Sequence, residues 1–263
     1  MDLNELKKYL IDTDFFYYDN YLGVIRNIEY DNRVGCYVLY FYKGEKKYIP
    51  DFYMYQYFIN LLKNIRFKIL RDRKIENLVH FTPMSNLKSI LENGFVSRKI
   101  LDVFNVDYQY SDSLRLDGKL DFISTSISFP NYKMFYFKRK ENEDTSWAVL
   151  SIDSSILIDK IDTEFYRTNC ASSDASKCRY SPCSNEALLD MFYVSDREPK
   201  LPLNYTTNPQ AEVMVKYSID KSFIKCIDTK GENKIVRYLA TNANIDYNPE
   251  SNLFGPRMDY RRW

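Results

Sequence analysis

The chain has 263 residues, of which 45% are hydrophobic and 28% are charged, a composition typical of a globular protein with a substantial core. Lysine and arginine total 37 against 36 for aspartate and glutamate, so the formal charge of +1 disfavours capture of nucleic acid or membrane by bulk charge. The sequence contains no apolar run of about 18 residues and no basic start followed by an apolar stretch, so we expect neither a membrane span nor a signal peptide.

The five cysteines are odd in number and unevenly spaced, which is typical of reduced thiols in a cytoplasmic protein. Three of them cluster, at Cys170, Cys178 and Cys183. Their C-x7-C-x4-C spacing is not that of a zinc site, and no histidine is near them. We therefore expect a cytoplasmic protein without a bound metal.

Residues 1–70 are predicted to form a small accessory unit. The runs 23–30 and 35–42 are rich in β-branched and aromatic residues and are separated by DNRV, which predicts a β-hairpin. Residues 51–65 have the pattern of an amphipathic helix. The charged stretch RDRKIEN, residues 71–77, is predicted to lead as a linker into a second domain, 71–263.

The stretch HFTPMSNLKSILENGF, residues 80–95, predicts a helix with well-defined ends. Its apolar residues recur at helical spacing. Thr82 is a candidate N-cap, and Pro83 suits the first helical position. Gly94 suits the left-handed position that follows a last helical turn. Just before this helix, in a short predicted strand, stands His80, the only histidine of the chain.

Beyond this helix the sequence predicts mostly strands. Residues 166–185 are rich in serine and poor in large aliphatic residues, which indicates an exposed or mobile loop. Together the elements indicate an α+β fold. The predicted strands cover 121–129, 134–140, 147–153, 211–219 and 223–229, and a short helix covers 185–193.

Several polar residues could carry chemistry. In an extended strand, Gln210 and Glu212 would share one face, opposite Val213, and would place an amide beside a carboxylate. The same spacing is found on ordinary solvated strand faces. Four further polar residues could also act in a site: His80, Thr82, Asn86 and Arg115. Taken singly, each of them also fits a purely structural role.

Taken together, these motifs resemble the DarT family, whose members are ADP-ribosyltransferase toxins that use NAD to modify nucleic acid. The ordered motifs span roughly residues 78–228. They are HFT-x3-NL-x2-IL-x2-G, an arginine in RLDG, SISFPNYKMFY, TN-x-ASS and NPQAEVMV. The segment TNCASS departs from the family's small-residue run at Cys170. The resemblance implies an ADP-ribosyltransferase-like split β-sheet core with flanking helices.

The resemblance also implies roles for two catalytic residues. Glu212 matches the family's catalytic glutamate, which would stabilise a cationic ribose and help to deprotonate the target base. Arg115 matches the active-site arginine, whose fixed charge could pair with the diphosphate of NAD or steer the acceptor.

Further residues are implied as ligand contacts. His80 and Thr82, with Asn86 as a weaker match, would hold NAD. Gln210 and Asn169 would face the nucleic acid. The basic residues Lys138, Arg139 and Lys140 could line a groove for the acceptor strand, although a charge run exposed to solvent has the same pattern.

The implied acceptor is a base of single-stranded DNA or of RNA. The family also implies a toxin with an antitoxin partner, in a toxin–antitoxin or anti-phage system. Two alternatives stay open. The Ser-Thr-Ser run at 124–126, with an arginine and a Q-x-E motif, is also the signature of transferases that modify proteins. The second alternative is a catalytically inactive relative that only binds nucleic acid. The presence of Arg115 and Glu212 disfavours it.

Overall fold

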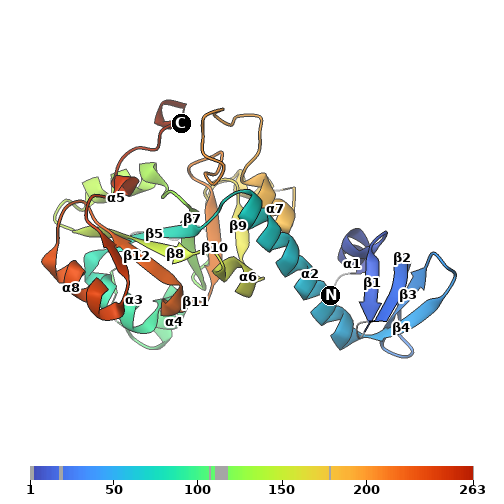
Figure 1. Cartoon of the computed structure of the whole chain (residues 1–263). Coiled ribbons are helices and arrows are strands. Elements are labelled where there is room, and N and C mark those ends of the chain that lie inside the picture. The colour runs from blue at the N-terminus through green and yellow to red at the C-terminus, as the bar shows by residue number, and fades with distance from the viewer. Residues whose placement is uncertain (1–2, 18–19, 107, 110–117, 178, 263) are drawn as a thin grey trace. The chain divides into compact units, whose positions relative to one another are not determined.

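The computed structural model describes residues 3–17, 20–106, 108–109, 118–177 and 179–262 (Figure 1). Contacts divide the chain into two compact units, 1–64 and 65–263. The division falls inside a single helix, α2 (Asp51–Asp72), which contributes buried residues to the core of each unit. Distinct roles for an accessory unit and a transferase domain stay a prediction.

The first unit is a four-stranded antiparallel sheet in the order β1-β2-β3-β4. The predicted hairpin is formed by β2 and β3, whose pairing ends at Asp31 and Cys36. Side chains of the sheet, α1 and the first part of α2 share one hydrophobic core, which includes Leu6, Leu39 and Phe58. The elements are α1 (Leu3–Leu10), β1 (Asp14–Tyr17), β2 (Asn20–Asp31), β3 (Cys36–Phe41) and β4 (Lys46–Pro50).

The helix α2 is longer than the predicted 51–65. Its last turns belong to the second unit, where Arg66, Ile69 and Leu70 are buried. Ile75, just beyond the helix, is buried in the same core. The prediction of a linker at 71–77 is therefore wrong, because these residues form the end of α2 and a tight turn into the sheet.

The second unit contains a seven-stranded sheet in the order β13-β12-β8-β5-β7-β10-β9, in which only β12 and β13 are parallel. A two-stranded sheet pairs β6 with β11. The strands are β5 (Asn77–Pro83), β6 (Phe95–Val96), β7 (Phe122–Ile127), β8 (Trp147–Asp153), β9 (Glu164–Tyr166), β10 (Glu212–Lys216), β11 (Ser218–Ile219), β12 (Ile224–Asp228) and β13 (Asp246–Asn248).

Short helices accompany this sheet, and the combination confirms the predicted α+β class. No helix in the described part of the chain is long and apolar enough to cross a membrane. The α-helices are α3 (Leu87–Asn93), α4 (Arg98–Val103), α5 (Tyr132–Glu141), α6 (Ile156–Asp159), α7 (Asn185–Asp190) and α8 (Lys234–Ala243). The 3-10 turns are η1 (Met84–Asn86), η2 (Ala175–Lys177), η3 (Lys221–Phe223), η4 (Asn252–Phe254) and η5 (Tyr260–Arg262).

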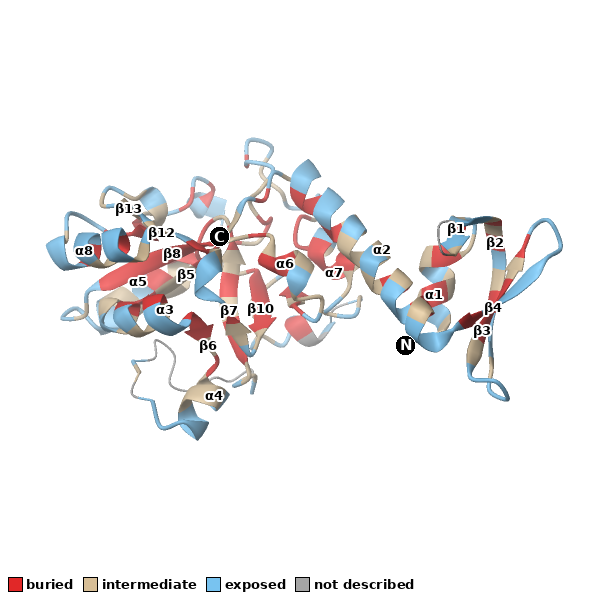
Figure 2. Ribbon diagram, turned by 60° about the horizontal axis from the view of Figure 1, so that its bottom comes forward, coloured by how far each residue is buried: buried red, intermediate tan, exposed pale blue. Residues whose placement is uncertain are grey.

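The strand β8 shows why the sheet is stable. Alternate residues of it lie in different hydrophobic clusters: Leu150 and Ile152 in the main core, and Trp147 and Val149 in a second cluster with Phe135. Both faces of the strand are therefore covered, which explains its continuous apolar sequence. Figure 2 shows the buried central strands of this unit and the exposed outer surfaces of its helices.

The sheet splits between β5 and β7. These strands pair only at Leu78–Ile127 and Val79–Ser126, whereas β5 continues to pair with β8 along its whole length. Beyond Val79 the two strands are no longer paired with each other. The split core implied by the family resemblance is thus present, and the position of the split decides where a ligand can enter.

Two local predictions need correction, and a third is confirmed. Residues 134–140 are helical (α5), and Asn131 caps this helix by accepting a hydrogen bond from the Met134 amide at 3.2 Å. Thr82 is not an N-cap: it lies in β5, and α3 begins only at Leu87 after η1. Gly94 does end α3 with a positive φ of 76°, and a Cβ there would lie 2.3 Å from the Ile219 carbonyl oxygen.

The predicted strand 211–219 consists of two shorter strands, β10 and β11. The final elements α8 and β13 were not predicted. The helix α8 is capped by Asn233, whose side chain accepts hydrogen bonds from the amides of Ile235 and Val236.

Candidate active site

A cavity of about 670 Å³ opens where β5 and β7 separate. Ligand sites are commonly concave and of this size. Its walls come from β5, η1, α3, β6, α4, β7, α5, the 169–171 segment and the start of β10. Of the residues predicted to act in the site, six line this cavity: His80, Thr82, Asn86, Lys138, Asn169 and Glu212.

The strand register brings these distant residues together. Because β7 pairs antiparallel with β10, Thr125 lies opposite Val213 and Ser124 lies opposite Met214. The Thr125 side chain donates a hydrogen bond to the Val213 carbonyl at 2.9 Å and fixes this register from the buried face. Ser124 is therefore placed between β5 and the start of β10.

Glu212 is a buried carboxylate held at the cavity wall, with only 7% of its surface exposed. The Ser124 hydroxyl donates to Oε1 at 3.3 Å, and the Cys170 backbone amide donates to Oε2 at 2.9 Å. Hydrogen bonds to the charged form of a carboxylate stabilise that form. The arrangement fixes both oxygens of Glu212, so the side chain can meet a ligand without reorganising.

His80 is fixed by a contact across the split. Its Nδ1 lies 2.8 Å from the Ser124 carbonyl oxygen. Since a carbonyl oxygen only accepts, Nδ1 carries the proton in this contact. The edge of the Phe95 ring packs against the imidazole, with ring centroids 5.1 Å apart. His80 is thus oriented on the cavity wall by both a polar and an aromatic neighbour.

Thr82 and Asn86 form one side of the cavity. The Asn86 amide nitrogen donates to Thr82 Oγ1 at 3.0 Å. Asn86 also clamps the backbone of Gln109: its nitrogen donates to the Gln109 carbonyl at 2.6 Å, and its oxygen accepts from the Gln109 amide at 3.0 Å. Asn86 therefore fixes the backbone at Gln109.

The 169–171 segment contacts the Glu212 carboxylate through its backbone. Asn169 Oδ1 accepts a hydrogen bond from the Ala171 amide at 2.8 Å, which closes a tight turn and presents the Cys170 amide to Glu212. The departure from the family pattern at Cys170 does not affect this contact, because the backbone makes it. The predicted role of Asn169 as an acceptor contact stays a prediction.

The strand next to Glu212 adds a second polar pair. Tyr166 of β9 lies opposite Glu212 in the sheet, and its hydroxyl donates to Glu164 at 2.7 Å. Burial, together with this hydrogen bond, raises the pKa of Tyr166 well above its usual value. The phenol therefore stays protonated over the physiological range and adds no charge beside the carboxylate.

Two predicted residues are not brought into the described cavity wall. Gln210 lies in a turn before β10, with its amide bonded to Asn208 Oδ1 at 2.8 Å. It does not share a strand face with Glu212, because the strand begins at Glu212 itself. Arg115 lies outside the described residues.

Lys138 and Arg139, in the charged run 138–140, make different contacts. Lys138 lines the cavity and pairs with Glu141 at 3.1 Å. Arg139 instead donates to the Phe254 carbonyl at 2.8 Å and lies over the Phe135 ring, so it holds the helix in place. Only Lys138 of these two cations faces the cavity.

Ser124 and the Cys170 amide are not among the site residues predicted from the sequence. By its sequence, the Ser-Thr-Ser run at 124–126 indicates only another transferase class. The structure shows that Ser124 connects His80 and Glu212 through its carbonyl and its hydroxyl. A backbone amide such as that of Cys170 leaves no signal in a sequence.

A split sheet with a buried glutamate and a fixed histidine on its cavity defines the class of an ADP-ribosyltransferase-like enzyme. The family model described as ssDNA thymidine ADP-ribosyltransferase, DarT, matches residues 79–246. This match covers well over half of the chain, and the chain belongs to the DarT family.

Comparison with curated proteins gives no match. Among solved structures, Thermosipho africanus DarTG in complex with ADP-ribose is 20% identical, with a TM-score of 0.46 over 68% of this chain, which spans about half (51%) of that protein. Thermus sp. 2.9 DarT in complex with NAD⁺ is 12% identical, with a TM-score of 0.42 over 66% of this chain and 96% of that one. The same Thermus protein in complex with ADP-ribosylated ssDNA gives 12% identity and 0.45 over 69% and 97%.

Family membership confirms the predicted class of enzyme, an ADP-ribosyltransferase of a family described by its action on nucleic acid. The family description names single-stranded DNA, so RNA as the acceptor receives no support. It equally gives no support to the protein-modifying alternative suggested by the Ser-Thr-Ser run.

Proposed function

We propose that this chain transfers ADP-ribose from NAD to a thymidine base of single-stranded DNA and releases nicotinamide. The family match supports the reaction class and the acceptor. The observation that carries the proposal is the buried Glu212 carboxylate, fixed between Ser124 and Cys170 on the wall of a cavity of about 670 Å³. A negative group held in this way suits a reaction whose transition state is cationic.

Glu212 would act twice in this reaction. As the bond between ribose C1′ and nicotinamide breaks, nicotinamide leaves with the electron pair, and the carboxylate stabilises the positive charge on the ribose. The ring N–H nitrogen of thymine then forms a bond with C1′, and its proton passes to Glu212. Two fixed hydrogen bonds keep the carboxylate oriented through both steps.

His80, Thr82 and Asn86 would hold NAD. His80 and Thr82 are two residues apart in β5, so they share one face of the strand, at the part of β5 that no longer pairs with β7. Thr82 is nearly buried, and its hydroxyl accepts a hydrogen bond from Asn86, so the three residues form one polar wall. Arg115 would supply the fixed positive charge for the diphosphate or the acceptor.

Gln210 and Asn169 would contact the acceptor strand, from the two segments that flank Glu212. Lys138 supports the same assignment because it lines the cavity and carries a positive charge that can pair with a phosphate. The near-neutral net charge of the chain means that affinity for DNA must come from such local contacts.

The decisive experiment incubates the protein with labelled NAD and, in parallel, with thymidine-containing single-stranded DNA, the same DNA without thymidine, RNA, or cell protein. We expect label only on the thymidine-containing DNA. A Glu212→Ala variant should fold, as checked by circular dichroism, and should transfer nothing. Label on protein alone, or on none of the acceptors, would contradict the proposal.

We also propose that the protein is a toxin of a toxin–antitoxin or anti-phage system, acts in the cytoplasm, and is neutralised by a partner protein. The family resemblance supports this setting, and all described cysteines are free thiols, as expected in a reducing compartment. Expression of the wild-type chain alone should stop growth, whereas Glu212→Ala should be tolerated at the same level. Equal tolerance of both would contradict a toxin.

A further inference from the structure

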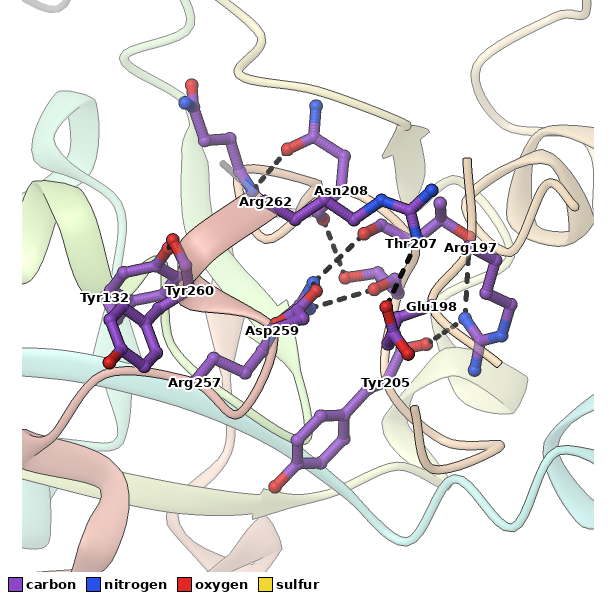
Figure 3. A network of polar contacts seen from close by, with 12 residues as sticks. Tyr132, Arg197, Glu198, Tyr205, Thr207, Asn208, Arg257, Asp259, Tyr260 and Arg262 are labelled. Carbon is purple, nitrogen blue, oxygen red and sulfur yellow. Dashed lines mark hydrogen bonds and ion pairs between the residues drawn. The ribbon is translucent and has the colours of Figure 1, made fainter. Parts of the chain in front are cut away.

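A buried ion pair lies close to the segment that precedes Glu212. Arg257 is 2% exposed and faces Asp259 with two hydrogen bonds, Nε to Oδ1 and Nη2 to Oδ2, both 2.6 Å long (Figure 3). Such a bidentate pair fixes the plane of the guanidinium group.

The same guanidinium group holds two backbone carbonyls. Arg257 Nη1 donates to the Thr206 carbonyl at 2.8 Å, and Nη2 donates to the Thr207 carbonyl at 3.0 Å. These two residues are fully or almost fully buried. Buried carbonyls need hydrogen-bond donors. Because this segment is not part of a strand, Arg257 provides the donors that a neighbouring strand would otherwise provide.

A second arginine holds the segment from the other side. Arg197 donates to the Tyr205 carbonyl at 2.6 Å and to Thr207 Oγ1 at 3.4 Å (Figure 3). Thr207 Oγ1 in turn donates to the Tyr193 carbonyl at 2.6 Å. Residues 205–207 are thus fixed by both backbone and side-chain contacts.

From there a short chain of contacts leads to the carboxylate. The Thr206 hydroxyl donates to the Asn208 carbonyl at 2.9 Å. Asn208 accepts from the Gln210 amide at its side chain and from the Ala211 amide, 3.1 Å away, at its carbonyl. Glu212 follows directly. The turn that carries Gln210 and leads into Glu212 therefore follows directly on residues 206–207, whose carbonyls Arg257 holds.

We propose that Arg257, oriented by Asp259, is a positioning residue for the Gln210–Glu212 segment in the transfer reaction. The inference rests on the proposed function, since it assigns work to the same carboxylate. It does not derive from the family match, which ends at residue 246 and leaves 257–259 outside. Arg257 contacts no lining residue of the cavity in its hydrogen bonds, so it acts through the turn.

The test uses Arg257→Lys, which keeps a charge beside Asp259 but lacks the fork that reaches both carbonyls. We expect kcat for transfer to thymidine-containing single-stranded DNA to fall about 10- to 100-fold, the effect of a small misplacement of a catalytic group. The KM for NAD should change by less than about twofold. The variant displaces the carboxylate that stabilises the transition state, whereas the residues proposed to hold NAD stay in place. Asp259→Asn should change kcat in the same direction.

Two matched variants separate positioning from plain stability. Arg66→Lys alters another buried arginine, which holds the carbonyls of Leu157 and Cys183 and is remote in sequence from the turn. Arg262→Ala removes an exposed pair with Glu198 in the same network. Both should keep wild-type kcat at a temperature well below their unfolding. Equal kcat losses in Arg66→Lys and Arg257→Lys would overturn the proposal, as would unchanged kcat in Arg257→Lys.

A readout independent of activity completes the test. Backbone hydrogen exchange at Gln210 and Ala211 should accelerate in Arg257→Lys and in Asp259→Asn, while exchange in β5 stays unchanged. If Arg257→Lys does not fold, Asp259→Asn decides by the same two measurements. If the wild-type protein transfers no ADP-ribose but exchange at the turn still accelerates in the variants, only the proposed function is overturned. Unchanged exchange at the turn would overturn the positioning role.

Discussion

Ser124 and Glu212 lie on neighbouring strands, and the Ser124 hydroxyl donates a hydrogen bond to Oε1 of the Glu212 carboxylate over 3.3 Å. The carbonyl of the same serine accepts a hydrogen bond from His80. One residue thus connects the proposed NAD-holding side of the cavity with the proposed catalytic side.

Removing the hydroxyl in Ser124→Ala should lower kcat about tenfold, because a carboxylate loses one of its two fixed hydrogen bonds. Steady-state kinetics of ADP-ribose transfer to single-stranded DNA measure this effect. Ser126→Ala is the control, since Ser126 lines the same cavity on the same strand and no contact with Glu212 is seen for it. Similar losses in both variants would show that the hydrogen bond to Glu212 is not the cause.

His80→Leu should raise the KM for NAD about two- to tenfold, the equivalent of one lost hydrogen bond, while kcat changes less. His80→Asn should restore part of the affinity, because an amide NH₂ can replace Nδ1 as donor to the Ser124 carbonyl. Isothermal titration with NAD provides an independent value. A loss confined to kcat, with unchanged NAD affinity, would instead indicate that His80 acts in the chemical step.

Asn86→Asp should loosen the segment that ends at Gln109, because a carboxylate cannot donate to the Gln109 carbonyl. We expect faster proteolysis within 104–109 and a higher KM for NAD. Asn93→Asp adds the same charge to the wall of the same cavity without touching Gln109 and should leave proteolysis unchanged. Equal proteolysis of the two variants would show that the hydrogen bonds between Asn86 and Gln109 do not protect this segment.

The Cys226 thiol predicts a specific pH dependence of stability. Burial, and then the charges of Asp228 and Asp246, raise its pKa to about 12. Above pH about 8.5 the unfolded chain loses this proton while the folded chain keeps it, so the free energy of unfolding falls as pH rises towards 12, by at most about 1.4 kcal/mol per pH unit. Below pH about 8.5 the group contributes no slope.

Urea unfolding at pH 8, 9 and 10 measures this dependence. Cys226→Ser should show a shallower decline than wild type, since serine does not titrate in this range. Cys36→Ser, in the first unit, is the control and should leave the free energy of unfolding of the second unit unchanged. Parallel declines in wild type and Cys226→Ser would contradict the assignment.

Regular elements with one clear pattern could be predicted from the sequence. The helix α3, with a single apolar stripe and Gly94 at its end, and the largely apolar strand β8 are examples. The helix α5 was mistaken for a strand because Phe135, Tyr136 and Phe137 favour strands locally. Its state is decided by tertiary contacts, since Phe135 packs against Phe81 and Phe254.

The candidate site was predictable only as a set of residues. Glu212 and His80 could be named from motifs, because chemistry fixes the residue type at these positions. Their connection through Ser124 depends on strand register, and the Cys170 contact depends on backbone geometry. The contribution of Arg257 arises from a contact about 50 residues away along the chain. Neither register nor such contacts can be derived from one sequence.

The split between β5 and β7 has a consequence for resistance to inhibitors. Past Val79, the β5 edge borders the cavity instead of pairing with β7, so a ligand there meets peptide groups as well as side chains. Peptide groups are the same for every amino acid except proline, so few point mutations can remove them. A compound that hydrogen-bonds to this strand edge, as an added strand would, should therefore be harder to escape by mutation than one that depends on His80 or Asn86.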